Sequence, residues 1–325
     1  MNAQLILDGI SGLRVLVAGD ICLDRWCRYD PASSEPSRET GIPRIAVVST
    51  DVSPGAAGTV ANNLKALGAR EVSLLGVIGE DGFGFELKRA LGERGVSSGL
   101  AVFSASMPTF TYTKLINMET EVEDLPRVDF IYNQPVPAPT EQALLERLHS
   151  VWDQFDVVLV SDQAETQVGG VITERMRGAL AELAASSPGK VIWVDSRAHA
   201  ERFRRVILKC NLEESEAAVQ RANASDLRTH TQSPLLVITH GKLGALAVDE
   251  AGERWIPAVP VENPVDICGA GDSFSAGAAL ALSVTHSAVD AVRFGNLIAS
   301  ITIMKKGTGT ASPNEVLYIA KQWRA

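Results

Sequence analysis

A short run of small residues between two aspartates carries the strongest chemical signal in the sequence. It reads Asp266-Ile267-Cys268-Gly269-Ala270-Gly271-Asp272 and leads into a stretch of small residues with helical spacing, 274–283. Gly269, Ala270 and Gly271 leave backbone N–H groups uncovered at a helix N-terminus, which attracts phosphate oxygens. A carboxylate beside such an anion site suits a base that meets a substrate hydroxyl, so Asp272 indicates phosphoryl transfer. In the alternative interpretation, Asp272 only caps the helix and the glycines form a turn.

Two further polar segments follow strand-like runs. Asn211 and Glu214 offer oxygen ligands of the kind that Mg²⁺ prefers, although the same spacing also forms an Asx cap at a helix start. Thr239, Gly241 and Gly244 follow a buried run, and glycine there lets the backbone approach a ligand closely. The alternative for this second segment is a tight hairpin into the next strand.

The elements that must position these groups are short apolar strands alternating with Ala- and Leu-rich helices. Such alternation is typical of parallel βαβ units, whose strands are covered on both faces. The predicted strands are 14–18, 71–76, 157–160, 190–195, 206–208 and 235–239, and the predicted helices are 59–67, 84–94, 140–154, 170–185 and 215–222.

Two segments break this rhythm. Residues 28–50 are rich in Pro, Ser and charge before a strand-like run, and residues 100–134 alternate apolar and polar side chains as antiparallel strands do. Ligands of α/β sheets bind in the crevice at the carboxyl ends of the strands, so a small β layer there would act as a lid. The alternative is an ordinary β-rich edge.

The order of these motifs resembles that of the ribokinase family, also called PfkB carbohydrate kinases, whose signature is D-T-x-G-A-G-D. Asp266, Gly269, Ala270, Gly271 and Asp272 match it, while the two residues after Asp266 vary. The resemblance implies a ribokinase-like α/β fold with a largely parallel central sheet, helices on both faces and a small β lid. It also implies one kinase domain over residues 1–325, with the lid inserted as segments of about 28–50 and 100–134. In this family Gly269–Gly271 would form the anion hole and Asp272 would be the catalytic base.

The resemblance further implies ATP and Mg²⁺ as cofactors. Glu214 would hold Mg²⁺ through water, and Asp266 would help to hold a monovalent cation such as K⁺. The nucleotide would be contacted by residues after two strands and by one near the C-terminus: Asn211, Glu214, Thr239, Gly241, Gly244 and Asn296.

The sugar end of the family pattern is matched in part. Asp24, in a Gly-Asp segment after the first strand, corresponds to the acceptor of sugar hydroxyls, and a carboxylate can accept two such donors. Gly55 and Asn63 belong to the glycine-rich sugar motif that follows. Lys114 and Arg127, on the predicted β layer, would meet a substrate phosphate; alternatively they are solvated charges.

Within the family, the chain is most similar to the kinase half of the bifunctional enzymes of ADP-heptose synthesis, which phosphorylate heptose 7-phosphate at C1. Ala56 and Thr59 depart from that pattern by replacing a glycine and an Asn, and Glu165 stands where those kinases have a Lys. The prediction is ATP-dependent phosphorylation of a sugar or sugar-phosphate hydroxyl. A kinase for another sugar or nucleoside, and a non-catalytic sugar- or nucleotide-binding homologue, stay open as alternatives.

Composition excludes several other classes of protein. Among 325 residues, 30 Lys and Arg against 39 Asp and Glu give a net charge of −9, which argues against nucleic acid as a partner. The apolar runs are too short for a membrane span of about 20 residues. Four scattered cysteines predict neither a disulfide framework nor a zinc site. We therefore expect a cytoplasmic enzyme that acts on a small molecule. The family resemblance further implies a homodimer formed through the β lid.

Overall fold

The computed structural model describes residues 1–164, 168–219 and 224–323. Within these ranges the central sheet has eight strands in the order β14-β13-β12-β11-β10-β9-β1-β4. From β12 to β4 along this order, each strand pairs in parallel with its neighbour. Strands β13 and β14 add an antiparallel hairpin at the β12 edge. The bounds are β1 (Arg14–Gly19), β4 (Glu71–Leu75), β9 (Val157–Asp162), β10 (Val191–Ser196), β11 (Ile207–Asn211), β12 (Leu236–Thr239), β13 (Gly244–Asp249) and β14 (Gly252–Pro257).

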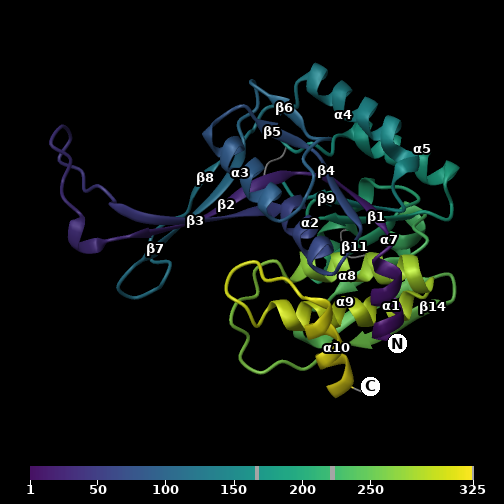
Figure 1. Ribbon diagram of the computed structural model, residues 1–325. Helices are drawn as coiled ribbons and strands as arrows, with labels where there is room; N and C mark the ends of the chain where they lie inside the picture. The colour runs from purple at the N-terminus through teal and green to yellow at the C-terminus, as the bar shows by residue number, and fades with distance from the viewer. Residues whose placement is uncertain (165–167, 220–223, 324–325) are drawn as a thin grey trace.

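Helices cover both faces of this sheet (Figure 1). Successive residues of a strand point to opposite faces, so Val15 and Val17 of β1 pack in one core cluster while Leu16 and Ala18 pack in the other. The first cluster includes residues of α1, α2, α8 and α9, and the second includes residues of α4 and α5. The helices are α1 (Ala3–Ile10), α2 (Ala57–Ala66), α3 (Gly82–Glu93), α4 (Ala138–Val151), α5 (Glu174–Ser186), α6 (Leu212–Val219), α7 (Ala224–Thr231), α8 (Ala270–Thr285), α9 (Ala288–Thr302) and α10 (Pro313–Gln322). The predicted fold class, a largely parallel sheet with helices on both faces, is confirmed.

A second sheet projects from this body, with the loop between β2 and β3 at its far tip (Figure 1). Its strands in the described chain follow the order β3-β2-β7-β8, and their bounds are β2 (Ile21–Tyr29), β3 (Val47–Ala56), β7 (Phe110–Asn117) and β8 (Val128–Phe130). The predicted segments 28–50 and 100–134 hold only part of it. Strand β2 begins at Ile21, before the start of the predicted segment 28–50, because the chain passes directly from β1 into the second sheet. A short parallel pair, β5 (Val77–Gly79) and β6 (Val102–Ser104), lies beside it.

Local hydrogen bonds move some helix boundaries from the predicted positions. Helix α5 begins at Glu174 rather than near residue 170, because the side chain of Thr173 accepts a hydrogen bond from the backbone N–H of Met176 at 3.2 Å. Helix α6 begins at Leu212, and the end of the predicted helix 215–222 lies outside the described residues. Across the described ranges, no helix combines the length and apolar character needed to cross a bilayer.

Candidate active site

A cavity of about 160 Å³ opens where the second sheet meets the carboxyl ends of β9 and β10. Five of the predicted site residues line it together, although they come from distant parts of the chain: Asp24, Lys114, Arg127, Gly269 and Asp272. Its other lining residues are Cys22, Arg25, Trp26, Ala56, Thr59, Tyr112, Gln163, Arg197, Cys268 and Thr308. The crevice at the strand ends is the usual ligand site of open α/β sheets.

One wall of the cavity is the N-terminus of α8, which begins at Ala270. Gly269 is the N-cap and has φ +75°, a left-handed conformation that favours glycine. A Cβ at Gly269 would lie 3.2 Å from the Thr59 side chain and 3.3 Å from that of Thr308. Backbone conformation and crowding therefore both favour glycine here, and the N–H of Ala270 donates to the Ile267 carbonyl at 3.2 Å.

Asp272 lies in the first turn of α8 and faces the cavity. Its Oδ1 accepts a hydrogen bond of 2.8 Å from the Gln163 side-chain amide. Burial raises the pKa of Asp272 to about 6, with a further contribution from the charge of Asp195. Since the N-cap position belongs to Gly269, the simple capping interpretation does not describe this carboxylate. Its environment is that of a group poised to take up a proton near neutral pH.

Gln163 was not among the predicted site residues. Its backbone N–H donates to Asp20 Oδ2 at 2.9 Å, and the N–H of Ala164 donates to the same oxygen at 2.8 Å. Asp20 thus holds the start of this loop so that the Gln163 side chain reaches Asp272. Its position in the sequence could have indicated a site residue, because Gln163 directly follows β9 at the carboxyl edge of the sheet.

Asp24 lies on β2, on the side of the cavity that the second sheet forms. Burial raises the pKa of Asp24 to about 6, while the Cys22 thiol, which donates to Oδ1 at 3.7 Å, and nearby positive charges lower it. Gly55 pairs with Cys22 across the two strands. A Cβ at Gly55 would lie 2.5 Å from both Asp24 oxygens. The absence of a side chain at this position therefore keeps the carboxylate accessible.

Besides Arg25, three cationic side chains line the cavity. Lys114 Nζ lies 3.8 Å from a Glu123 carboxylate oxygen, and Arg127 makes a 2.7 Å ion pair with Asp129. Arg197, which follows β10, joins them. Their charges lower the pKa of Asp24. Such a cluster suits recognition of an anionic group such as a phosphate.

The altered part of the sugar motif has an unusual backbone. Ala56 has φ +51° and ψ −118°, so the alanine occupies a conformation that glycine adopts more readily. The Thr59 hydroxyl donates to the carbonyl of Pro54 at 3.2 Å. Asn63 is fully buried on α2, where its amide donates to the Thr59 carbonyl at 3.0 Å. Among the described residues that line the cavity, Thr59 and Ala56 are present and Asn63 is not.

Asn211 and Glu214 bond to each other reciprocally at the start of α6. The N–H of Asn211 donates to Glu214 Oε2 at 2.6 Å, and the N–H of Glu214 donates to Asn211 Oδ1 at 2.8 Å. The capping alternative is therefore realised in the structure. Burial raises the pKa of Glu214, whereas the nearby Lys209 lowers it. In the described part of the chain, no group of three His, Cys, Asp or Glu side chains is arranged as a metal site.

The turn after β12 is the hairpin that was the alternative interpretation of this segment. Gly244 has φ +127°, and a Cβ there would lie 2.2 Å from the Ile256 carbonyl oxygen on the paired strand. Strand pairing alone thus requires Gly244. Gly241 has φ +54° with open space where a side chain would be. Thr239 donates to the Cys210 carbonyl at 3.4 Å.

Comparison with known proteins identifies the family. Residues 43–315 match the pfkB family of carbohydrate kinases. The chain belongs to this family. The bifunctional protein HldE of Methylococcus capsulatus is 33% identical over 96% of this chain, which spans 65% of that relative's length.

Solved structures of other kinases share the fold of this PfkB chain. Ribokinase from Arabidopsis thaliana, complexed with ribose and ATP, has a TM-score of 0.69 at 17% identity and covers 95% of this chain and 99% of its own. Phosphofructokinase-2 from Escherichia coli, in complex with potassium, has a TM-score of 0.69 at 18% identity with the same coverage. The predicted ribokinase-like fold is confirmed.

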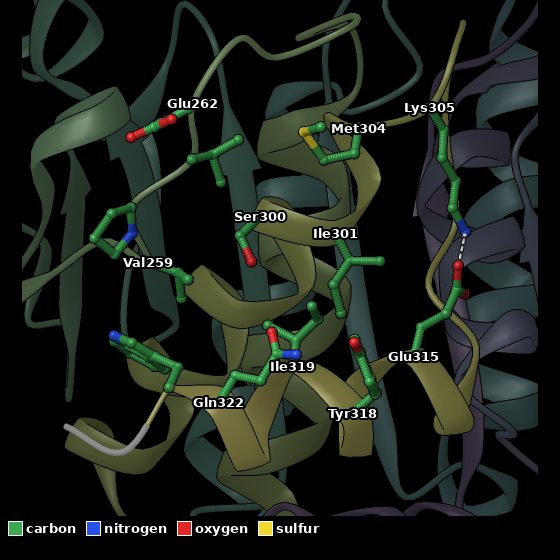
Figure 2. A pocket seen from close by; sticks show the side chains of 13 residues that line it. Val259, Glu262, Ser300, Ile301, Met304, Lys305, Glu315, Tyr318, Ile319 and Gln322 are labelled. Atoms are coloured by element: carbon green, nitrogen blue, oxygen red, sulfur yellow. Dashed lines mark ion pairs between the residues drawn. The ribbon is translucent and has the colours of Figure 1, made fainter.

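The PfkB chain has a second, larger cavity of about 720 Å³ between the loop 259–262 and helices α9 and α10 (Figure 2). Val259, Ile301 and Ile319 line its apolar part, and a 2.7 Å ion pair between Lys305 and Glu315 lies at one end (Figure 2). The loop enters from β14, where the N–H of Ala258 donates to the Leu243 carbonyl at 3.3 Å. The cavity is therefore adjacent to the predicted nucleotide turn.

Asn296 and Asp266 connect segments around these cavities of the PfkB chain. The Asn296 amide donates to the Pro257 carbonyl at 3.0 Å, just before the loop that borders the second cavity. Asp266 accepts from the N–H of Cys268 at 2.9 Å and from the N–H of Gly307 at 3.0 Å. Asp266 thus ties the anion-hole segment to the loop after α9. Glu165, where heptose 7-phosphate kinases have a Lys, lies outside the described residues.

Proposed function

We propose that this chain transfers the γ-phosphoryl group of ATP to a hydroxyl of a phosphorylated sugar, with heptose 7-phosphate phosphorylated at C1. One observation carries the proposal. Asp272 and the glycine-capped start of α8 form one side of a cavity whose other side holds Asp24 and three cationic side chains. The arrangement offers a base, an anion hole, a hydroxyl acceptor and a phosphate site within one enclosed space.

Sugar binding falls to groups on the second sheet together with Arg197, which follows β10 of the central sheet. Asp24 accepts hydrogen bonds from two sugar hydroxyls, and Gly55 leaves it room to do so. Lys114, Arg127 and Arg197 hold the substrate phosphate, which fixes the orientation of the sugar relative to Asp272. The resemblance to the heptose kinases and the match to proteins named HldE support the heptose assignment.

Proton transfer falls to Asp272. The acceptor hydroxyl donates its proton to the free carboxylate oxygen while Gln163 holds the other. A pKa of about 6 leaves Asp272 mostly ionised at pH 7 and still able to accept a proton late in a loose transition state. Backbone N–H groups of Gly269, Ala270 and Gly271 stabilise the charge on the transferring group.

The ATP and cation sites follow from the elements around α8. Asn211 and Glu214 would hold Mg²⁺ through water, and bound Mg²⁺ neutralises phosphate charge. Thr239 and Gly241 border the nucleotide, whose base enters the apolar cavity of Figure 2 next to Asn296. Asp266 takes the monovalent cation. The ATP and potassium found in the two related kinases support these assignments.

We also propose that the second sheet acts as a lid and as a homodimer contact. The outer half of β3 exposes apolar side chains, with Val47 at 45% and Val48 at 57% of their full accessible area. An exposed apolar edge strand is a template for association. Sedimentation should show a dimer that Val48→Glu converts to a monomer, and a monomeric starting protein would refute this contact.

The decisive test measures ADP release from ATP across heptose 7-phosphate, its unphosphorylated form, other sugar phosphates, and nucleosides. We expect turnover with heptose 7-phosphate to be greatest and Asp272→Asn to lower kcat by at least about 10³-fold. If no acceptor supports turnover above the Asp272→Asn control while ATP still binds, the chain is a binding homologue and the kinase proposal fails. If another acceptor is preferred, only the heptose assignment fails.

A further inference from the structure

A buried ion pair lies beneath the N-terminus of α8. Asp195 on β10 and Lys209 on β11 are directly paired residues of neighbouring parallel strands. Lys209 Nζ lies 3.0 Å from one Asp195 oxygen and 2.9 Å from the other. The two residues are 4% and 5% exposed. Buried ion pairs often add little net stability, because both charges must leave water, so stability alone gives a weak reason for this one.

Lys209 reaches the anion hole. A Cβ built at Gly271 would lie 3.0 Å from Lys209 Nζ, so the ammonium group occupies space beside the second glycine. A helix N-terminus carries positive potential, and a cation there is disfavoured unless an anion binds between them. The lysine therefore adds positive charge at the place where a phosphoryl group would bind.

Asp195 connects the pair to the helix that carries the base. Asp195 Oδ2 accepts a hydrogen bond of 3.0 Å from the hydroxyl of Ser275, which lies one turn after Asp272. Residues three apart on a helix share a face, so Ser275 and Asp272 both face the ends of β10 and β11. The ion pair and the base thus belong to one packed unit.

The charged groups around Asp272 come from several elements. Asp195 raises the pKa of Asp272, while Lys209 and Arg197 lower it. Burial raises the pKa values of the thiols of Cys22 on β2 and Cys268 before α8, and the negative charge of Asp272 adds to both shifts. The Gln163 amide donates a hydrogen bond of 2.8 Å to Asp272 Oδ1.

We propose that Lys209 and Asp195 are positioning residues for Asp272, with Lys209 offsetting the negative charge of Asp195 and placing positive charge beside Gly271. The inference rests on the proposed role of Asp272 as base. Its consequence is that each member of the pair controls the ionisation of Asp272 in the opposite direction. Neither residue needs to touch the sugar.

Two nearly isosteric variants test the charges of Lys209 and Asp195 one at a time. In Lys209→Met the charge of Asp195 is no longer offset, so we expect the acid limb of the kcat profile to move up by about one pH unit. In Asp195→Asn the lysine acts unopposed, so the limb should move down by a similar amount. Ser275→Ala removes the hydrogen bond and keeps both charges, and it serves as the matched control with an unmoved limb. If Lys209 and Asp195 served only to pack the core, both variants would lower kcat, and the acid limb would not move in opposite directions in the two.

A ¹³C carboxylate titration of Asp272 by NMR, assigned with Asp272→Asn, gives the same information without turnover. If the resonance shifts in opposite directions but no acceptor is phosphorylated, the pair is confirmed and the kinase proposal fails. If turnover persists while both limb and resonance stay unmoved, or move together, the pair has no such role. If one single variant does not fold, the other decides the question, because its limb and resonance must move in the stated direction and an unmoved titration refutes the role of the pair.

Discussion

At the end of the cavity that we propose for the phosphoryl group, the groups that matter belong to the packed body: Gly269 is the N-cap of α8, and Asp272 lies in its first turn against Gln163. At the sugar end, Asp24 and Lys114 stand on a sheet that projects from that body (Figure 1). Backbone conformation and core packing determine the first region. Side chains on an outlying sheet determine the second, so its specificity can change with little effect on the fold.

Adding a single methyl group to Gly269 should damage the phosphoryl end, although less than the loss of the Asp272 carboxylate. In Gly269→Ala the side chain would meet Thr59 and Thr308 and would strain a backbone with φ +75°. We expect kcat to fall about 10²-fold because the anion-hole N–H groups move. Steady-state kinetics with both substrates checks this.

Gly252→Ala is the matched control for that variant. Gly252 has φ +110° in the β13–β14 hairpin, and a side chain there meets open space. It should lose stability through the same kind of backbone strain while kcat stays unchanged. Equal losses of kcat in both variants would show that the geometry around Gly269 is not special.

A weaker and more selective effect is expected at the sugar end from Lys114→Met. Loss of this charge should raise KM for a phosphorylated acceptor about tenfold and leave KM for ATP unchanged. Lys88→Met on α3, whose ammonium lies over the Phe103 ring, changes net charge equally outside the cavity. A similar rise in KM for an unphosphorylated sugar would contradict a phosphate contact at Lys114.

The two ends of the cavity should also differ in which kinetic constant depends on pH, kcat for one and KM for the other. Asp272 acts as a base only when ionised, and its pKa is raised to about 6, so kcat should rise with pH through 6 and fall about tenfold per unit on the acid side. Protonation of Asp24, whose pKa is also about 6, should instead raise KM for the sugar. Profiles of kcat and KM between pH 4.5 and 8 test this, and a flat kcat would remove Asp272 as base.

The smallest expected effect is a gain in stability. Ala56 has φ +51°, so Ala56→Gly should raise the free energy of unfolding by about 1 kcal/mol as strain is relieved. Ala57→Gly, at the first position of α2, should lower it by a similar amount. Urea unfolding of both variants measures the difference, and destabilisation by Ala56→Gly would show that the alanine is not strained.

Much of the fold was predictable because buried parallel strands have a simple apolar pattern and alternate with helices. The second sheet was placed only roughly, since Asp20 alone separates β2 from β1 and no longer loop marks the start of the second sheet. Within the site, the sequence predicted that Gly269 lies at a helix N-terminus and that Asp24 lies shortly after the first strand. Gln163 was missed because an uncharged amide after a strand gives no functional signal in the sequence. Its role depends on the 2.8 Å hydrogen bond to Asp272, which only the tertiary structure shows.

The amino-acid sequence alone determined the phosphoryl end, because a glycine N-cap followed by an aspartate in the first helical turn acts through local backbone geometry. Only the tertiary structure decided what surrounds that aspartate. It brought Gln163, Asp195 and Lys209 to Asp272 from three separate strand ends, and it buried Asn63 against the Thr59 carbonyl on α2. Interactions between residues distant in sequence depend on strand order and register, which no local pattern specifies.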